Sequence, residues 1–581
     1  MNQTPASGTH LQQETYDLVV CGGGLAGLCC AIAAARENLS VCLIQNRPVL
    51  GGNCSSEMRV TVHGAGCHHA YGRETGIISE MLIEERSRNH EVINENGWTN
   101  SVWDMVMYEW ATAEPNLTLY LNTEVLDVRM DDGTLCSEKE ASRPPVSLEH
   151  GYGLRPACNS SSRIKAILAR ISSAQTLLEI QGETFVDATG DAIVGDLAGC
   201  EWRWGSESRE ETGEVHAPLE GSTDVMGNSI HIRCRDIGRE VPFKAPDWAV
   251  KHEDASYFYE QGRHPRDPRG GFWWIEIGVP YNTLYENEDI RHELTRHALG
   301  VWDWMKNKDP VMKEACKNYA LEFIGQVPGK RENRRLMGKY LLNEHDIQQN
   351  RVFEDEIAHG GWFVDLHTPG GLLAASSEPA AAENYQSDSE YAAKSYVGPY
   401  GIPLRSLFSK DIENLGMAGR NISSTHAALG TVRVMGTTAL MGQALGVAAA
   451  IAHRAGQPVT AIAGDQFKTI QQTLLRDGCF LRHTSLNDPN NLAPSAQVTA
   501  SSTAPFTGTS SQEDRWMGIN RDTALLIPVD GGPLETVSLS LKATEATQIN
   551  LRLVRLNTIW DYSREDKQVL AKSTLDVTAG T

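Results

Sequence analysis

The sequence predicts an α/β protein with a parallel sheet near its N-terminal end, an inserted domain of mixed α and β structure, and a β-rich tail. Three observations carry this prediction. A short apolar run, a cluster of glycines and an alanine-rich stretch follow one another between residues 17 and 36. A second stretch of small residues lies at 435–456, and after residue 488 the composition changes to Pro, Ser, Thr and Asn. Strand, turn and helix in immediate succession are typical of a parallel sheet covered by helices.

The first of these stretches reads DLVVCGGGLAGLCCAIAAA. Leu18–Cys21 has the continuous apolar pattern of a buried parallel strand, and residues 25–36 have the composition of a helix. Gly22, Gly24 and Gly27 fit the pattern G-x-G-x-x-G. The first glycine allows a tight turn, the second lets the backbone approach a pyrophosphate, and the third lets helix and strand pack closely. The helix N-terminus adds free N–H groups, so the stretch predicts a dinucleotide site.

The nature of the dinucleotide is left open by this motif. The second strand, SVCLIQ, ends at residue 45, which is 23 residues after Gly22 (45 minus 22). An acidic residue at this place usually binds the adenosine ribose, whereas this chain has Gln45. Its side-chain carbonyl can accept a bond from a ribose hydroxyl, but without the assistance of a charge. The ribose contact is therefore predicted to be weaker, and both FAD and NAD remain candidates.

The charge of the chain argues against two classes of partner. The 581 residues include 52 Lys and Arg against 74 Asp and Glu, which gives a formal net charge of -22. Such a charge repels phosphate backbones and acidic membrane surfaces. We therefore expect neither nucleic acid nor a membrane as a partner.

The N-terminal segment and the cysteines indicate the compartment and the metal content. Residues 1–16 lack the apolar core of a signal peptide, so a cytoplasmic protein is predicted. The twelve cysteines form no C-x-x-C pair. That pattern argues against an iron–sulfur cluster, a structural zinc or a redox dithiol, and we expect no metal.

Strand-like and helix-like stretches divide the chain further. Two alternating runs in NLTLYLNTEVLDVRMDD and the runs RIKAILARISS and TLLEIQGETFVDATGD predict strands, and a helix is expected around 288–306. The predicted parts are a disordered N-terminus (1–15), the first part of a nucleotide-binding domain (16–204), an inserted substrate domain (205–400), the second part of the nucleotide-binding domain (401–488) and a β-sandwich-like domain (489–581).

Three stretches together resemble a known family. They are CGGGLAGLCCAIAAARENLSVCLIQNRPVLGGN, GKRENRRLMGKYLLNEHDI and NLGMAGRNISSTHAALGTVRVMGTTALMGQALGVAAA. The chain resembles, over roughly residues 15–480, FAD-dependent oxidoreductases with a glutathione-reductase-type fold, in the subgroup related to the flavoprotein component of heterodisulfide reductase. The resemblance implies a Rossmann-like domain with three ββα layers and FAD as cofactor, because an NAD-only dehydrogenase has no use for the second glycine-rich segment.

The resemblance also implies which residues hold FAD. In such folds the strand that ends in Ala-Gly-Arg passes the ribityl chain, and the N-terminus of the last helix points at the flavin ring. The implied cofactor-binding residues are Gly22, Gly24, Leu25, Ala26, Gly27, Gln45, Asn46, Arg47, Gly51, Gly52, Asn53, Val125, Asp191, Gly419, Arg420, Gly430, Thr431 and Gly442. Relatives in the heterodisulfide reductase group add iron–sulfur clusters on cysteine motifs that this sequence lacks.

A flavin oxidoreductase needs a group that handles the substrate proton and donors that fix the substrate oxygen. The candidates are His426 in SSTHAALG, Arg433 in TVRVMG, Arg335 in GKRENRRLMG and His367 in VDLHTPGG. A neutral His426 beside the flavin segment could take a hydroxyl proton, and the alternative is a structural histidine bonded to a backbone carbonyl. In VHGAGCHHAYGRE, adjacent histidines would point apart, so we expect a cavity lining there and not a metal site.

These observations predict an FAD-dependent dehydrogenase or oxidase that removes hydride from a CH–OH carbon of a small molecule. A sugar or glycoside is suggested by the β-rich tail and by FWWIE and WDWM, whose tryptophans could stack on sugar faces or belong to a core. Two alternatives stay open: a reductase of activated C=C bonds, and a polysaccharide lyase or carbohydrate-binding protein. The electron acceptor is unknown, and assembly into a homo-oligomer is left open.

Overall fold

The computed structural model describes residues 10–90, 99–138, 143–375 and 395–502, and shorter pieces of the remainder, of which 536–556 and 568–580 are the longest. The chain divides into two compact units, residues 1–486 and 487–581. The division falls two residues before the boundary expected after residue 488.

The first unit is built on a parallel sheet with the strand order β3-β2-β1-β7-β16. The strands are β1 (His10–Cys21), β2 (Val41–Ile44), β3 (Leu117–Tyr120), β7 (Thr176–Asp187) and β16 (Leu415–Met417). All four residues of β2 and the last four of β1 are buried, as expected for strands that are covered on both faces.

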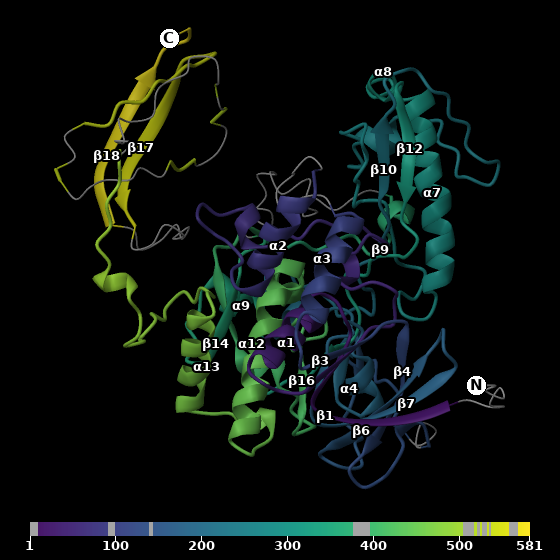
Figure 1. Ribbon diagram of the computed structural model, residues 1–581. Coiled ribbons are helices and arrows are strands. Elements are labelled where there is room, and N and C mark those ends of the chain that lie inside the picture. Colours follow the sequence, from purple (N-terminus) through teal and green to yellow (C-terminus); the bar gives the residue numbers. More distant parts are fainter. Residues whose placement is uncertain are drawn as a thin grey trace. The chain divides into compact units, whose positions relative to one another are not determined.

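Each face of this sheet is covered by a different layer. On one face, Leu18 and Val20 pack in one core with the helices α1 (Leu25–Arg36) and α12 (Met435–Arg454). On the other face, Val19 and Cys21 pack against the antiparallel strands β4 (Thr123–Met130) and β6 (Ile164–Ile171), which continue into β7. Figure 1 shows α1 and α12 side by side. The predicted α/β fold with three layers is confirmed.

The contact between α1 and α12 depends on small residues. A Cβ atom at Gly442 would lie 1.9 Å from the carbonyl oxygen of Ala26, and one at Gly446 would lie 2.3 Å from that of Cys30. Glycine is therefore needed for the two helices to approach this closely. Among the described helices, α12 is the one long and apolar enough to cross a membrane, but 94% of its apolar window is buried inside the protein.

The N-terminal segment corrects one expectation. β1 begins at His10, and residues 10–16 pair with residues 176–182 of β7. Residues 10–15 were expected to be disordered because they are polar, yet backbone pairing with β7 orders them while their side chains stay mostly outside the core. The rest of the predicted disordered segment, 1–9, lies outside the described residues.

The inserted domain has a core of its own, formed by residues 230–316 and Leu372. Its main elements are β10 (Ile232–Asp236), β12 (Tyr319–Ile324), α7 (Asn287–Asn307), α8 (Lys313–Cys316), α6 (Ser256–Tyr259), β9 (Asn228–Ser229) and β11 (Glu276–Ile277). The domain was predicted to reach residue 400, but β14 (Glu356–Gly360) pairs with β15 (Tyr400–Pro403) and packs in the core of α1 and α12. The separate core is therefore shorter than expected.

Shorter elements complete the first unit. They are α2 (Ile77–Arg88), α3 (Ser101–Thr112), α4 (Ile193–Leu197), α5 (Arg209–Thr212), α9 (Glu344–Gln348), α11 (His426–Val432), α13 (Asp465–Arg476), β5 (Gly153–Arg155), β8 (Trp202–Trp204) and β13 (Arg335–Leu336). The second unit contains the antiparallel pair β17 (Thr547–Arg555) and β18 (Gln568–Val577). Much of the predicted β-sandwich lies outside the described residues, so the sandwich stays a prediction.

Candidate active site

The glycine motif forms a tight loop between β1 and α1. Gly22 has a φ of +108°, and a Cβ atom there would lie 2.3 Å from the carbonyl oxygen of Ala188. A Cβ atom at Gly27 would lie 1.8 Å from the carbonyl oxygen of Gly22. Gly24 is different, because no described atom outside its immediate surroundings lies within 4 Å of the Cβ position. The loop is therefore closed on the side of the sheet and open at Gly24.

The N-terminus of α1 faces this opening. The first helical hydrogen bond runs from Leu28 to the carbonyl of Gly24, so the amides of Leu25, Ala26 and Gly27 precede the helical ladder. The first turn contains no acidic residue. Free amides and the positive end of the helix dipole favour a phosphate, and the open face at Gly24 leaves room for one. These residues fit the pyrophosphate of a dinucleotide.

Gln45 lies at the end of β2 and braces this loop. Its Oε1 accepts a hydrogen bond from the amide of Gly23 at 2.9 Å, and its Nε2 donates to the carbonyl of Val49 at 3.1 Å. The side chain is 4% exposed. The predicted ribose contact stays a prediction, as do the adenosine contacts of the half-buried Arg47 and Val125 and the exposed Asn46.

The next predicted cofactor residues continue from the loop toward a cavity. Gly51 forms a bridge with Gly24, and Gly52 follows it in a left-handed conformation. Asn53 donates a hydrogen bond to the carbonyl of Lys330 at 3.0 Å. Gly419 also has a positive φ, of 109°.

Asp191 joins two cations beside this path. Its carboxylate lies 2.6 Å from Lys330 and 3.3 Å from Arg420. Burial acts to raise the pKa of Asp191, but the charges of Lys330 and Arg420 outweigh it and hold the pKa below its ordinary value. Asp191 is therefore an anion that positions Lys330 and Arg420 at the cavity.

A cavity of about 380 Å³ lies between the glycine-rich part and the inserted domain. One side is formed by Asn53, Thr61, His63, Lys330, Trp362, Arg420, Arg433, Val434 and Met435, which include the start of α12. The other side is formed by residues of the inserted domain and its neighbours, among them His231, Arg233, Arg263, Asp267, Trp273, Trp274, Glu276, Arg331, Asp365 and His367. A volume of this size is typical of a small-molecule site.

His367 is held in the cavity wall by two carboxylates. Its Nδ1 lies 2.8 Å from Glu276, and its Nε2 lies 3.1 Å from Asp365. Arg331 lies 3.2 Å from Glu276, and Arg433 lies 3.1 Å from Asp365. We call these five residues the His367 cluster.

The charges in the His367 cluster set its protonation. Burial and Arg331 act to lower the pKa of His367, but Asp365 and Glu276 outweigh them and raise the pKa above its ordinary value. Burial acts to raise the pKa of Asp365, but His367 and Arg433 hold the pKa well below its ordinary value. The cluster therefore favours the charged form of His367, in which both ring nitrogens carry a proton and neither can take another.

A second histidine of the cavity was missed by the sequence analysis. His231 precedes β10 and is 5% exposed, and its Nδ1 lies 3.2 Å from the carbonyl oxygen of Arg59. Its Nε2 is buried without a hydrogen-bond partner among the described residues. Burial, together with the charge of Arg233, lowers the pKa of His231 well below its ordinary value. The Nδ1–H therefore donates to Arg59, and Nε2 keeps a lone pair.

A family model described as FAD dependent oxidoreductase matches residues 17–474 of this chain. The chain belongs to the FAD-dependent oxidoreductase family. FAD is accordingly its cofactor, and the amides at Gly24 together with the path from Gly51 to Asn53 fit that cofactor. The oxidoreductase is an enzyme of flavin chemistry, which confirms the prediction at the level of the family.

Individual relatives are distant from this oxidoreductase. A glycerol-3-phosphate dehydrogenase of Mycobacterium leprae is 34% identical over 82 residues, which span 14% of each chain. A solved geranylgeranyl bacteriochlorophyll reductase-like protein of Thermoplasma acidophilum is 11% identical, with a TM-score of 0.32, over 80% of this chain and 84% of that one. A quinol fumarate reductase of E. coli is 15% identical, with a TM-score of 0.29, over 80% and 75%.

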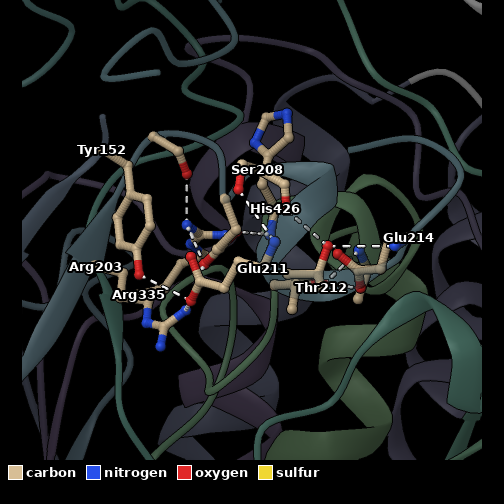
Figure 2. Close-up of polar contacts among 12 residues, drawn as sticks. Tyr152, Arg203, Ser208, Glu211, Thr212, Glu214, Arg335 and His426 are labelled. Atoms are coloured by element: carbon tan, nitrogen blue, oxygen red, sulfur yellow. Dashed lines mark hydrogen bonds and ion pairs between the residues drawn. The ribbon is translucent and has the colours of Figure 1, made fainter. Parts of the chain in front are cut away.

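Two predicted catalytic residues lie away from the cavity of the oxidoreductase, in a buried network around Glu207 (Figure 2). Arg335 is fully buried and pairs with Glu207 at 3.1 Å. The amide of His426 donates to Glu207 at 2.9 Å, while its Nδ1 lies 2.8 Å from Glu332. Buried carboxylates bind both residues and neither lines the cavity, which favours structural roles, and their catalytic roles stay predictions.

The network continues on the other side of Glu207. Arg203 lies 3.4 Å from Glu207 and 3.1 Å from Glu211, to which Tyr152 donates a hydrogen bond at 3.0 Å. We call Glu207, Arg203, Glu211, Tyr152, Arg335 and His426 the Glu207 cluster.

Three predicted cofactor residues of the oxidoreductase serve packing. Thr431 is fully buried, and its hydroxyl bonds Trp362 and Tyr400. Gly430 packs against Leu366 within α11. Gly442 lies under Ala26, where it brings α12 against α1. These three residues pack inside the FAD-binding domain and do not line the cavity.

The histidine-rich stretch is divided between cavity and core. His63 lines the cavity and stacks on Trp362, with 4.8 Å between the ring centroids. His69 lies outside the cavity wall and is bound to the carbonyl of Gly361 at 2.7 Å. Cys54 accepts a bond from Trp103, and burial raises the pKa of its thiol to about 12, so it stays protonated.

Proposed function

We propose that this oxidoreductase is a cytoplasmic dehydrogenase or oxidase of the subgroup related to the heterodisulfide reductase flavoprotein, and that it oxidises a CH–OH group of a small molecule. Bound FAD supplies the acceptor for the hydride that leaves the carbon. The proposal depends on one observation, the neutral His231 with an unpaired Nε2 on the cavity wall.

Such an oxidation needs a base for the hydroxyl proton and groups that stabilise the substrate oxygen, and residues of the cavity can supply both. His231 Nε2 accepts the proton of the substrate hydroxyl, because its Nδ1–H is already given to the carbonyl of Arg59. Arg433 donates a hydrogen bond to the substrate oxygen as the carbonyl forms, and the positive charge of His367 nearby stabilises the negative charge that develops on that oxygen.

A sugar-like substrate is supported by part of the tryptophan pattern. Trp273 and Trp274 of FWWIE line the cavity, where their rings can contact a sugar face. Trp302 and Trp304 of WDWM are buried in the core of the inserted domain and make no such contribution.

The test is the anaerobic reduction of the FAD-loaded enzyme by a panel of sugars, polyols and enoates. We expect a hydroxyl compound to bleach the flavin, and His231→Asn to slow the bleaching by about a hundredfold, the usual size of a general-base contribution. The matched control is His252→Asn. His252 is also buried with a lowered pKa, but it lies in the inserted domain outside the cavity wall. Equal rates in the two variants would refute the role of His231.

A second candidate, the reduction of an activated C=C bond, is favoured by the charge of the His367 cluster. His367 in its charged form and Arg433 are both donors, as the protonation of such a bond requires. Oxidation of the prereduced enzyme by an enoate, with no bleaching by any hydroxyl compound, would establish this function in place of the first.

A further inference from the structure

Arg263 is a buried cation in the wall of the cavity. Its side chain is 1% exposed, and it lies shortly after α6 in the inserted domain. Its Nη1 donates to Gln261 at 2.6 Å, and its Nη2 donates to the carbonyls of Ala374 at 2.7 Å and Gly371 at 3.2 Å. The guanidinium also lies 4.4 Å from the centre of the Tyr257 ring. All of these partners are neutral.

Arg263 differs in this respect from the carboxylates of the cavity wall and from the cations that pair with carboxylates there. Each carboxylate in the wall lies beside a cation within 3.2 Å: Asp267 beside Arg269, Glu276 beside Arg331, and Asp365 beside Arg433. Lys330 and Arg420 share Asp191. Among the described residues, no carboxylate forms an ion pair with Arg263, and burial lowers the pKa of its guanidinium.

The wall as a whole is rich in positive charge. It contains six Lys and Arg side chains against three carboxylates, in a chain whose net charge is -22. A buried charge without a counter-charge is strongly unfavourable, and the cavity gives an outside anion access to it. The cations that pair with Asp191 lie beside the cofactor path, whereas Arg263 belongs to the inserted domain.

We propose that the substrate carries an anionic group, a carboxylate or a phosphate, and that Arg263 binds this group; the proposal rests on the function proposed above. The anion supplies the counter-charge that the wall lacks. Binding it at the inserted domain orients the rest of the substrate toward His231 and the start of α12, which line the same cavity.

The experiment compares three ligands with the same six-carbon chain on the full-length, FAD-loaded enzyme: D-gluconate, glucose 6-phosphate and glucose. Binding is measured from the change of flavin absorbance and from the unfolding temperature, and anaerobic bleaching is measured separately. We expect at least one anion to bind about ten to a hundred times more tightly than glucose, the contribution of one charge-assisted hydrogen-bond pair. Whether gluconate or glucose 6-phosphate binds more tightly distinguishes a carboxylate from a phosphate.

Substitutions of Arg263 test whether the anion binds at this residue. Arg263→Met should remove the preference for the anions over glucose, and Arg263→Lys should keep part of it. Arg291→Met is the matched control, because Arg291 is an exposed arginine of the same domain, paired with Glu288. If Arg263→Met does not fold, the difference in anion preference between the wild type and Arg263→Lys tests the proposal.

Three results would overturn the proposal: glucose binding as tightly as both anions, no binding of either anion at millimolar concentration, or an unchanged preference in Arg263→Met. Anion binding at Arg263 without bleaching by any hydroxyl compound would refute the proposed function alone. Bleaching by glucose with no preference for anions would refute the anion site alone.

Discussion

The Glu207 cluster and the His367 cluster contain the same kinds of side chain at similar distances, yet they differ in one respect. Both contain buried pairs of arginine and glutamate and a histidine, which binds Glu207 through its backbone amide in the first cluster and Glu276 through its ring in the second. Glu207 and Arg335 are buried in protein and do not line the cavity, whereas the members of the His367 cluster line a cavity of about 380 Å³. The comparison teaches that residue type and burial do not identify a reactive site, and that access for a ligand does.

The largest effect on stability is expected from a substitution in the Glu207 cluster. Arg335→Leu leaves Glu207 buried with Arg203 as its remaining cation, at 3.4 Å. We expect the free energy of unfolding to fall by about 3–5 kcal/mol, the usual cost of breaking a buried pair. Chemical denaturation measures it, with the exposed Arg291→Leu as control at under about 0.5 kcal/mol. A loss below about 1 kcal/mol for Arg335→Leu would contradict an enclosed structural cluster.

Substitutions in the His367 cluster should slow catalysis strongly and lower the stability much less. Arg433→Gln leaves Asp365 beside His367, and water in the cavity can solvate the remaining charges. We expect stopped-flow flavin reduction to slow by about a hundredfold, as for the loss of one donor to a developing oxyanion, with bound FAD retained. Arg433→Lys should recover part of the rate. A variant that unfolds at room temperature but reduces normally when folded would show that Arg433 is structural.

A substitution of His426 tests whether this residue has a structural or a catalytic role. Its ring binds Glu332 and its amide binds Glu207, so His426→Gln should lower the free energy of unfolding by about 1–2 kcal/mol. The reduction rate of the flavin-loaded variant should stay within about threefold of the wild type, because the ring does not line the cavity. A hundredfold slower reduction would restore His426 as the base.

Two of the cavity histidines, His367 and His231, should have opposite effects of pH on stability. The pKa of His367 is raised by Asp365 and Glu276, so its stabilising contribution is complete below about pH 6.5 and is lost as the pH rises through the folded-state pKa. The pKa of His231 is lowered by burial, so its contribution is present above about pH 6.5 and is lost as the pH falls. Denaturation of wild type, His367→Gln and His231→Gln across this range measures both signs, and parallel curves would refute them.

The smallest effect is expected from removing the second unit. Neither cluster includes a residue beyond Leu486, and the flavin segments also precede it. A chain ending at residue 486 should keep its FAD content and its rate of reduction within about twofold. Loss of flavin from a soluble chain of this length would place part of the cofactor site in the second unit.

The fold was predictable because its signals are local. The apolar run at Leu18–Cys21, the glycines that follow and the helix from Leu25 to Arg36 lie where the pattern placed them. Gln45 was recognised as unusual, but its bond to the amide of Gly23 depends on how the loop closes, which the sequence does not specify.

The catalytic assignments were less predictable because neighbours in sequence diverge in space. Arg331 and Arg335 are four residues apart, roughly 13 Å in an extended chain, and they belong to different clusters. His426 begins α11 and Arg433 follows its last residue, about 10 Å away along the axis, and only Arg433 lines the cavity. His231 was missed because a single histidine in an apolar strand pattern forms no motif.

The assembly of the sheet and its covering helices has a consequence for synthesis of the chain. α1 ends at Arg36 and α12 begins at Met435, so 399 residues (435 minus 36) are added before the partner of α1 exists. At about 5–20 residues per second, this takes roughly 20–80 s on the ribosome. During that time the apolar face of α1 and the edge of β7 have no cover from α12 and β16. We therefore expect the growing polypeptide to expose this apolar surface until α12 has been made, and the flavin-binding core to be complete only then.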